Sequence, residues 1–236
     1  MIKDFVNLIE INKDEVLRYL EYKGQDISDG LKSTIDECIN LIKNKINPRY
    51  MLRVYPIRVD KFSIYIQGTG IKLESRELYN LLKECDKCIV MAATLGLEAE
   101  KEIKKYSHSD LTKCIIIDSC ATTAIEEVCD FIQDDLEKEL LKKGEYLTTR
   151  YSPGYGDLSI DKNVDIINLL NTQKEIGLTI TGNSIMIPRK SVVAIMGIAK
   201  SKPKKNKKSC SNCINNFDCK YKKEVEDYGC QRIYEG

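Results

Sequence analysis

The spacing of apolar residues predicts helices first and strands afterwards in the N-terminal third of the chain. Within 12–20 and 28–46, apolar residues recur every three or four positions, which places them on one face of a helix. Asn12 followed by Glu15 is typical of a helix start. Residues 51–68 instead nearly alternate between apolar and polar and are rich in β-branched and aromatic residues, which indicates strands.

The rest of the pattern predicts a mixture of helices and strands. The predicted elements are a helix at 75–88, an apolar strand at 88–96, a helix at 94–106, a long helix within 114–144 with a short extended entry at 114–117, a strand and turn at 146–156, a short helix capped by Asp161, and a pair of strands at 177–200. Because the order lacks regular βαβ alternation, we expect an α+β fold with a mixed, largely antiparallel sheet and flanking helices.

A change in composition near residue 200 predicts a domain boundary. The segment KSKPKKNKK holds six Lys, one Pro and no apolar residue, which favours a flexible linker; a docking patch for an acidic partner is the alternative. We therefore predict an α+β domain at 1–199, a Lys-rich linker at 200–209 and a small Cys-rich tail at 210–236.

Composition narrows the function classes. The chain has 236 residues, 42% hydrophobic and 31% charged, with a net charge of +1, which argues against general nucleic-acid binding. No apolar run reaches the length of a membrane span, and the first residues do not form a secretory signal, so we expect a cytoplasmic protein. Its ten Cys should then be thiols or metal ligands rather than disulfides. A single histidine, His108, leaves little room for His-based catalysis.

Residues 148–157, TTRYSPGYGD, concentrate unusual side chains in a short stretch. Pro153, Gly154 and Gly156 favour a turn. A turn alone does not need the additional Arg and two Tyr, which would surround a backbone that a ligand can approach closely. A plain turn with a solvated Arg150 is the alternative, and composition alone favours it.

The same segment resembles the S-adenosylmethionine-binding activation domain of cobalamin-dependent methionine synthase, in a free-standing form. Its Arg-x-x-Pro-Gly-Tyr motif is matched by Arg150, Pro153, Gly154 and Tyr155. Three further stretches agree in order, namely AATLG, IDSCATTAIEEVCDFI and GLTITGNSIMIPRKSV, so the resemblance extends over roughly 11–200. Two features differ: SVVAIMGIAK lacks the aromatic residues that contact the ligand in the synthase, and the Asp-x-His-x-x-Gly corrinoid motif is absent.

The resemblance implies a repair reaction in methionine biosynthesis. The cobalamin (vitamin B12) would be carried by a corrinoid-bearing methionine synthase or a related methyltransferase. An electron donor would reduce inactive cobalt(II), and S-adenosylmethionine would methylate the resulting cobalt(I). No catalytic side chain is expected, because cobalt(I) is already a strong nucleophile and the sulfonium an activated methyl donor. A non-catalytic S-adenosylmethionine-binding module or an electron-transfer accessory protein is the alternative.

The resemblance also implies which residues bind the ligand. They are Asp118, Glu126, Arg150, Ser152, Gly154 and Tyr155. Arg150 would bind the ligand's carboxylate, Glu126 its ammonium or ribose, and the backbone of the turn its adenine or ribose. Tyr155 would form a wall. A solvated helix face for Glu126, packing for Tyr155 and a helix cap for Asp118 are the alternatives.

Cysteine spacing gives a second specific signal. Cys210, Cys213, Cys219 and Cys230 form C-x2-C-x5-C-x10-C, which predicts one metal centre that organises the tail. Both zinc and an iron–sulfur cluster use four thiolates; we favour the cluster because the implied reaction needs an electron. The other six Cys fall in apolar stretches and are interpreted as core residues: Cys38, Cys85, Cys88, Cys114, Cys120 and Cys129.

Overall fold

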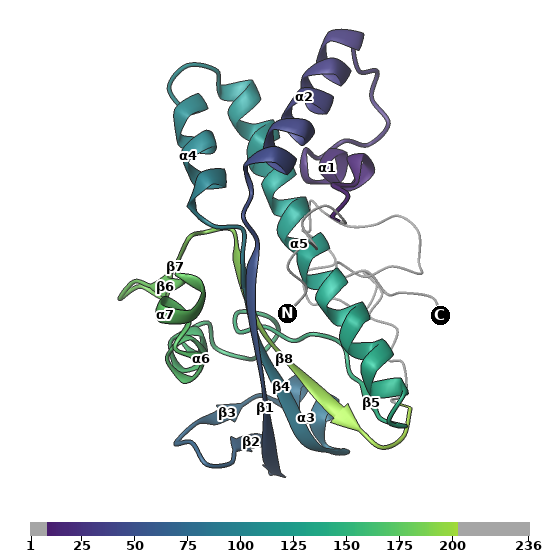
Figure 1. The fold of residues 1–236 in the computed structure, drawn as a ribbon, viewed down its shortest axis with the longest axis vertical. Helices are drawn as coiled ribbons and strands as arrows, with labels where there is room; N and C mark the ends of the chain where they lie inside the picture. The colour runs from purple at the N-terminus through teal and green to yellow at the C-terminus, as the bar shows by residue number, and fades with distance from the viewer. Residues whose placement is uncertain (1–8, 203–236) are drawn as a thin grey trace.

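The computed structural model describes residues 9–202 and has an antiparallel sheet at its centre (Figure 1). The elements are α1 (Lys13–Tyr19), α2 (Asp29–Lys45), β1 (Arg49–Asp60), β2 (Ser63–Ile66), β3 (Lys72–Glu74), α3 (Arg76–Leu82), β4 (Cys85–Thr94), α4 (Leu97–Tyr106), α5 (Leu111–Leu141), β5 (Tyr146–Leu147), α6 (Lys162–Leu170), α7 (Thr172–Ile176), β6 (Thr179–Ile180), β7 (Met186–Ile187) and β8 (Ser191–Ala199). Six strands pair antiparallel in the order β3-β2-β1-β4-β8-β5, while β6 and β7 form a separate small hairpin. The predicted α+β fold is confirmed.

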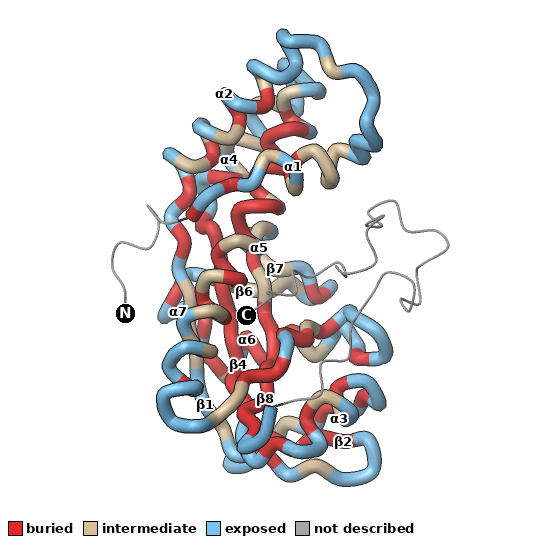
Figure 2. Tube along the Cα trace, turned by 90° about the vertical axis from the view of Figure 1, so that its right-hand side faces the viewer, coloured by how far each residue is buried: buried red, intermediate tan, exposed pale blue. Residues whose placement is uncertain are grey.

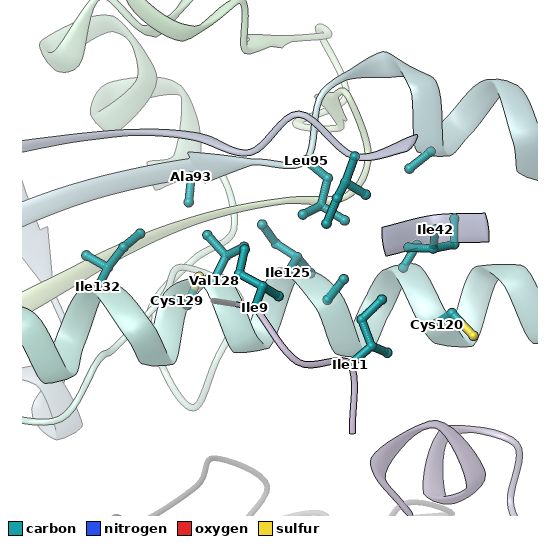
Figure 3. Packing of buried hydrophobic residues seen from close by; sticks show 14 of the residues in the cluster. Ile9, Ile11, Ile42, Ala93, Leu95, Cys120, Ile125, Val128, Cys129 and Ile132 are labelled. Carbon is teal, nitrogen blue, oxygen red and sulfur yellow. The ribbon is translucent and has the colours of Figure 1, made fainter. Parts of the chain in front are cut away.

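The helix α5 covers one face of the sheet. Its side chains Ile125, Val128 and Ile132 belong to a buried cluster that also contains Ala93 of β4, and Figure 3 shows Val128 and Ile132 directed towards that strand. Figure 1 shows α1, α2 and α4 gathered around the first half of α5, beyond the end of the sheet. The long helix therefore joins a helical layer to the sheet through one continuous core.

The opposite face of the sheet is covered by α3, α6 and α7, which form a second buried cluster. The strand β4 contributes to both clusters, because Ile89 and Met91 face α5 whereas Cys88 and Val90 face the other way. Figure 2 shows the resulting column of buried residues along β4, β8 and α5. Burial on both faces explains why this strand reads as a continuous apolar run rather than an alternating one.

Several predicted helix and strand boundaries are wrong. The helix predicted at 75–88 ends at Leu82, and Cys85 already begins β4. The predicted extended entry at 114–117 is helical, because α5 starts at Leu111, where the Asp110 side chain accepts a hydrogen bond from the Lys113 N–H. The apolar residues of that entry have a buried face that outweighs the weaker helix propensity of Ile.

The structure also tests the predicted helix cap by Asp161 and the predicted burial of six Cys. Asp161 stands at the N-cap position of α6, but its carboxylate accepts hydrogen bonds from Ser159 and Ser184 instead of capping the helix. All six Cys interpreted as core residues are buried, free thiols.

Within residues 9–202, no helix has the length and apolarity needed to cross a membrane. The four tail Cys and most of the predicted linker lie outside the described residues, so their boundaries stay predictions.

Candidate functional site

The segment that follows β5 runs along the outer edge of β8 and fixes the orientation of Arg150. The Thr148 N–H donates to the Gly197 carbonyl (2.9 Å), and Tyr151 and Ile195 exchange two backbone hydrogen bonds of 3.0 and 2.9 Å. Successive residues of an extended segment point to opposite faces of a sheet. Arg150 accordingly points to the face covered by α5, while Tyr151 joins the core on the α3 and α6 side.

The guanidinium of Arg150 is buried against one face of α5. Its Nη2 lies 2.8 Å from Asp130 Oδ1 and 3.3 Å from Glu126 Oε2, and its Nη1 lies 3.3 Å from Gln133 Oε1. Burial opposes the positive charge of Arg150, but the adjacent carboxylates of Asp130 and Glu126 favour it, so that the pKa of Arg150 is raised. We call Glu126, Asp130, Gln133 and Arg150 the Arg150 cluster.

The two carboxylates of the Arg150 cluster differ in their access to solvent. The Asp130 side chain is 7% exposed, whereas that of Glu126 is 38% exposed. The surrounding protein nevertheless raises the pKa of Glu126, mainly by burial and against the attraction of Arg150. The α1 helix lies on this side, because Arg18 and Tyr19 both interact electrostatically with Glu126. Of the two carboxylates, Glu126 is therefore the one that solvent can contact.

The turn after Tyr151 leaves the sheet edge and presents Tyr155 to solvent. Gly154 and Gly156 adopt φ angles of +91° and +52°, which other residues resist. The Gly154 N–H donates to the Leu158 carbonyl (2.9 Å), which closes the turn. Tyr155 is 53% exposed, so core packing does not explain this residue.

Asp118 lies apart from the other predicted ligand-binding residues. It precedes Glu126 by eight positions, which places it about 12 Å away along α5. Its carboxylate pairs with Lys190 Nζ at 2.9 Å, and Lys190 also donates to Thr122 (2.8 Å). The alternative role as a helix cap is wrong, because Asp118 is inside α5. Its assignment to the ligand has no support from this geometry and stays a prediction.

The sequence interpretation missed Asp130 and Gln133. These residues follow Glu126 at i+4 and i+7, so all three share one face of α5. The alternative of a solvated helix face around Glu126 does not hold for Asp130 and Gln133, which are 5% and 7% exposed. The sequence did not reveal that the Arg150 side chain points towards α5, where it supplies the positive charge that allows Asp130 to be buried.

The comparisons with known proteins identify the family. Residues 82–213, more than half of the chain, match the family model described as "Vitamin B12 dependent methionine synthase, activation domain". The chain belongs to this family. The match spans α5, the Arg150 turn and β8. No curated protein matches the sequence.

A solved structure supports the activation-domain fold. The crystal structure of the MetH reactivation domain bound to AdoHcy aligns with a TM-score of 0.57 at 16% sequence identity. The alignment covers 79% of this chain and 76% of that one. At this identity, the similarity establishes the fold of the activation domain.

The unequal burial of the two carboxylates predicts unequal contributions to stability. We expect Asp130→Ala to lower the free energy of unfolding by about 3 kcal/mol, because it leaves a buried guanidinium with an incomplete set of partners. Glu126→Ala should cost less than about 1 kcal/mol, since its carboxylate reaches solvent. Urea unfolding measures the free energy of unfolding of both variants. Glu139→Ala, which removes an exposed carboxylate paired with Lys142 on the same helix, is the control; an equal loss in Asp130→Ala and this control would contradict the argument.

Proposed function

We propose that this protein is a methyltransferase-type enzyme that reactivates the cobalamin of a partner corrinoid protein with S-adenosylmethionine. The observation that carries the proposal is membership of the activation-domain family over the region containing the Arg150 cluster and its turn. The partner is a methionine synthase or a related corrinoid methyltransferase. A non-catalytic S-adenosylmethionine-binding protein or an electron-transfer accessory is the alternative.

The proposed reaction transfers one electron and one methyl group to the cobalt. An electron donor supplies one electron to the oxidised cobalt of the partner's cobalamin. The methyl group then leaves the sulfonium of S-adenosylmethionine for the reduced cobalt, and S-adenosylhomocysteine is released. No proton has to move, so the chain needs no general acid or base. Its contribution is to hold the sulfonium in line with the incoming cobalt.

The charges of the Arg150 cluster complement the amino-acid end of S-adenosylmethionine. That end carries a carboxylate and an ammonium group, and the cluster offers one guanidinium and two carboxylates. Arg150 would bind the ligand's carboxylate, which must share the guanidinium with Glu126 or Asp130. Glu126, the more exposed of the two, would accept hydrogen bonds from the ammonium or the ribose. The backbone at Ser152 and Gly154 would contact the adenine or ribose.

Apolar side chains beside the turn offer a face for the corrinoid partner. Tyr155 and Ile160 are each 53% exposed, and Ile160 lies beside Gly154. Ile185 is 51% exposed, and its neighbour Ser184 donates to Asp161 in the segment that follows the turn. Because methyl transfer requires the cobalt to approach the sulfonium directly, the surface around the ligand must also contact the partner. We therefore assign this exposed face to the partner, with Tyr155 as a wall of the ligand site.

The decisive experiment follows the methyl group. Under anaerobic conditions, the chain is mixed with a corrinoid methionine synthase lacking its own activation domain, a one-electron reductant and S-adenosylmethionine labelled in the methyl group. We expect label on the cobalamin and the absorbance of methylcobalamin. The isolated chain should not bind cobalamin tightly, because it lacks the corrinoid motif. Tight ligand binding without any transfer of label would favour the binding-module alternative.

We predict that Arg150 contributes to ligand affinity separately from its role in the fold. Arg150→Ala should weaken S-adenosylmethionine binding by about 1.5–3 kcal/mol in calorimetry, the scale of a hydrogen bond to a charged group. Since this variant also leaves Asp130 unpaired, the double variant Arg150→Met with Asp130→Leu provides a matched test. Replacing both buried charges with apolar groups should preserve the fold while the affinity stays low. Arg53→Ala, at an exposed position on β1, is the control. Wild-type affinity in the folded double variant would exclude Arg150 from the ligand site.

We also propose that Cys210, Cys213, Cys219 and Cys230 bind one metal centre, an iron–sulfur cluster in preference to zinc. Their spacing supports the proposal, and the required electron favours the cluster. Anaerobically purified protein should then be brown, and Cys213→Ala should lose both the colour and electron-dependent reactivation while it retains ligand binding. Colourless protein with one equivalent of zinc would select the structural alternative. Neither iron nor zinc, with all four thiols titratable, would eliminate both.

A further inference from the structure

The turn that follows Arg150 is tied at its far end to α3 through Asp157. One carboxylate oxygen, Oδ1, accepts hydrogen bonds from the Ser75 hydroxyl and the Glu77 N–H (3.4 Å), and the other, Oδ2, accepts from the Arg76 N–H (2.7 Å). Ser75 is itself the N-cap of α3, because its hydroxyl oxygen accepts from the Leu78 N–H (2.9 Å). Asp157 therefore binds a segment about 80 residues earlier in the chain.

A second contact holds the near end of the same turn to α3. The Tyr151 hydroxyl lies 3.1 Å from Glu77 Oε2 and 3.0 Å from the Tyr155 carbonyl, so its proton is shared between two acceptors. A side chain at Gly156 would collide with the Tyr151 hydroxyl and with the Glu77 carboxylate. The backbone between Tyr151 and Asp157 thus passes close against the first turn of α3.

We propose that Asp157 is a positioning residue for the ligand site, and that its carboxylate sets ligand affinity by holding the turn in its binding geometry. This inference rests on the proposed function, which assigns the turn backbone to the ligand. Tyr151 fixes the start of the turn through its backbone pairing with Ile195, and Asp157 fixes its end. Gly154 and Gly156 make the intervening backbone flexible when it is released, and ordering it would then oppose binding.

The carboxylate of Asp157 is suited to this role at neutral pH. Burial opposes its ionisation, but the hydrogen bonds from Ser75 and from the backbone N–H groups of Arg76 and Glu77 lower its pKa. A lowered pKa means that the folded state favours the ionised form. The stabilisation is complete above the ordinary pKa of an Asp and is lost as the pH falls through the lower folded value.

The test combines ligand affinity with amide hydrogen exchange in the turn. Asp157→Ala and the milder Asp157→Asn are compared with wild type and with Asp165→Asn, which removes a partly exposed carboxylate paired with Lys162 on α6. The probe is S-adenosylhomocysteine, titrated by calorimetry. We expect Asp157→Ala to weaken binding about tenfold, equivalent to about 1.4 kcal/mol. Exchange should accelerate at residues 152–158 but remain unchanged in α5 and β4.

A separate comparison distinguishes positioning from direct contact. The double variant Arg150→Met with Asp130→Leu should lose affinity without faster exchange at 152–158, whereas Asp157→Ala should show both changes. Ser75→Ala, which removes one partner of Asp157, should give the same pattern in weaker form. These results would support the inference.

Three outcomes would overturn the inference. The first is affinity within twofold of wild type in Asp157→Ala despite faster exchange in the turn. The second is unchanged exchange in the turn. The third is acceleration that extends through α5 and β4, which would indicate general destabilisation. Failure of the proposed function is recognised separately, because wild-type protein would then not bind S-adenosylhomocysteine, while the exchange data would still decide whether Asp157 anchors the turn.

Discussion

The ion pair between Arg150 and Asp130 is the contact on which the candidate site depends. It joins the segment at the outer edge of β8 to the middle of α5, the longest helix among residues 9–202. Both side chains are almost completely buried. Loss of Arg150 would leave a buried Asp130 carboxylate without its counter-charge, and loss of Asp130 would leave Arg150 with the more exposed and more distant Glu126 carboxylate. The pair connects the segment before the turn to the helix next to Glu126, while the backbone pairing of Tyr151 with Ile195 fixes where the turn starts. In the proposed function, the same guanidinium would pair with these carboxylates and bind the ligand's carboxylate.

The turn after Arg150 contacts different elements at its two ends. The α5 side supplies charge, through Arg150 and the carboxylates that face it. The α3 side supplies restraint, through Asp157 and the Tyr151–Glu77 contact. The exposed Tyr155 lies between them. This arrangement would suit the proposed reaction, in which the protein mainly has to hold two reacting molecules in line.

The sequence predicted the parts of the fold that depend on local patterns. The apolar periodicity of the helices, the two-sided burial of β4 and the turn at 152–156 are all readable along the chain. The helix boundaries at Leu82 and Leu111 were less predictable, because a buried face can override the preferences of individual residues. The direction of Arg150 and the partner of Asp157 were not predictable at all. Each depends on a residue between 20 and 82 positions away, which a single sequence does not reveal.

The pairing of β8 with β4 has a consequence for how the protein folds. Ile89 lies opposite Met196, so the two strands join residues 107 positions apart in the chain. Contacts between such distant residues form slowly, because a long loop must close before they can stabilise the structure. The edge that orients Arg150 exists only once β8 has docked. During synthesis from the N-terminus, α5 and the turn therefore emerge well before the strand that completes their arrangement, so the proposed ligand site would be among the last parts of the domain to form.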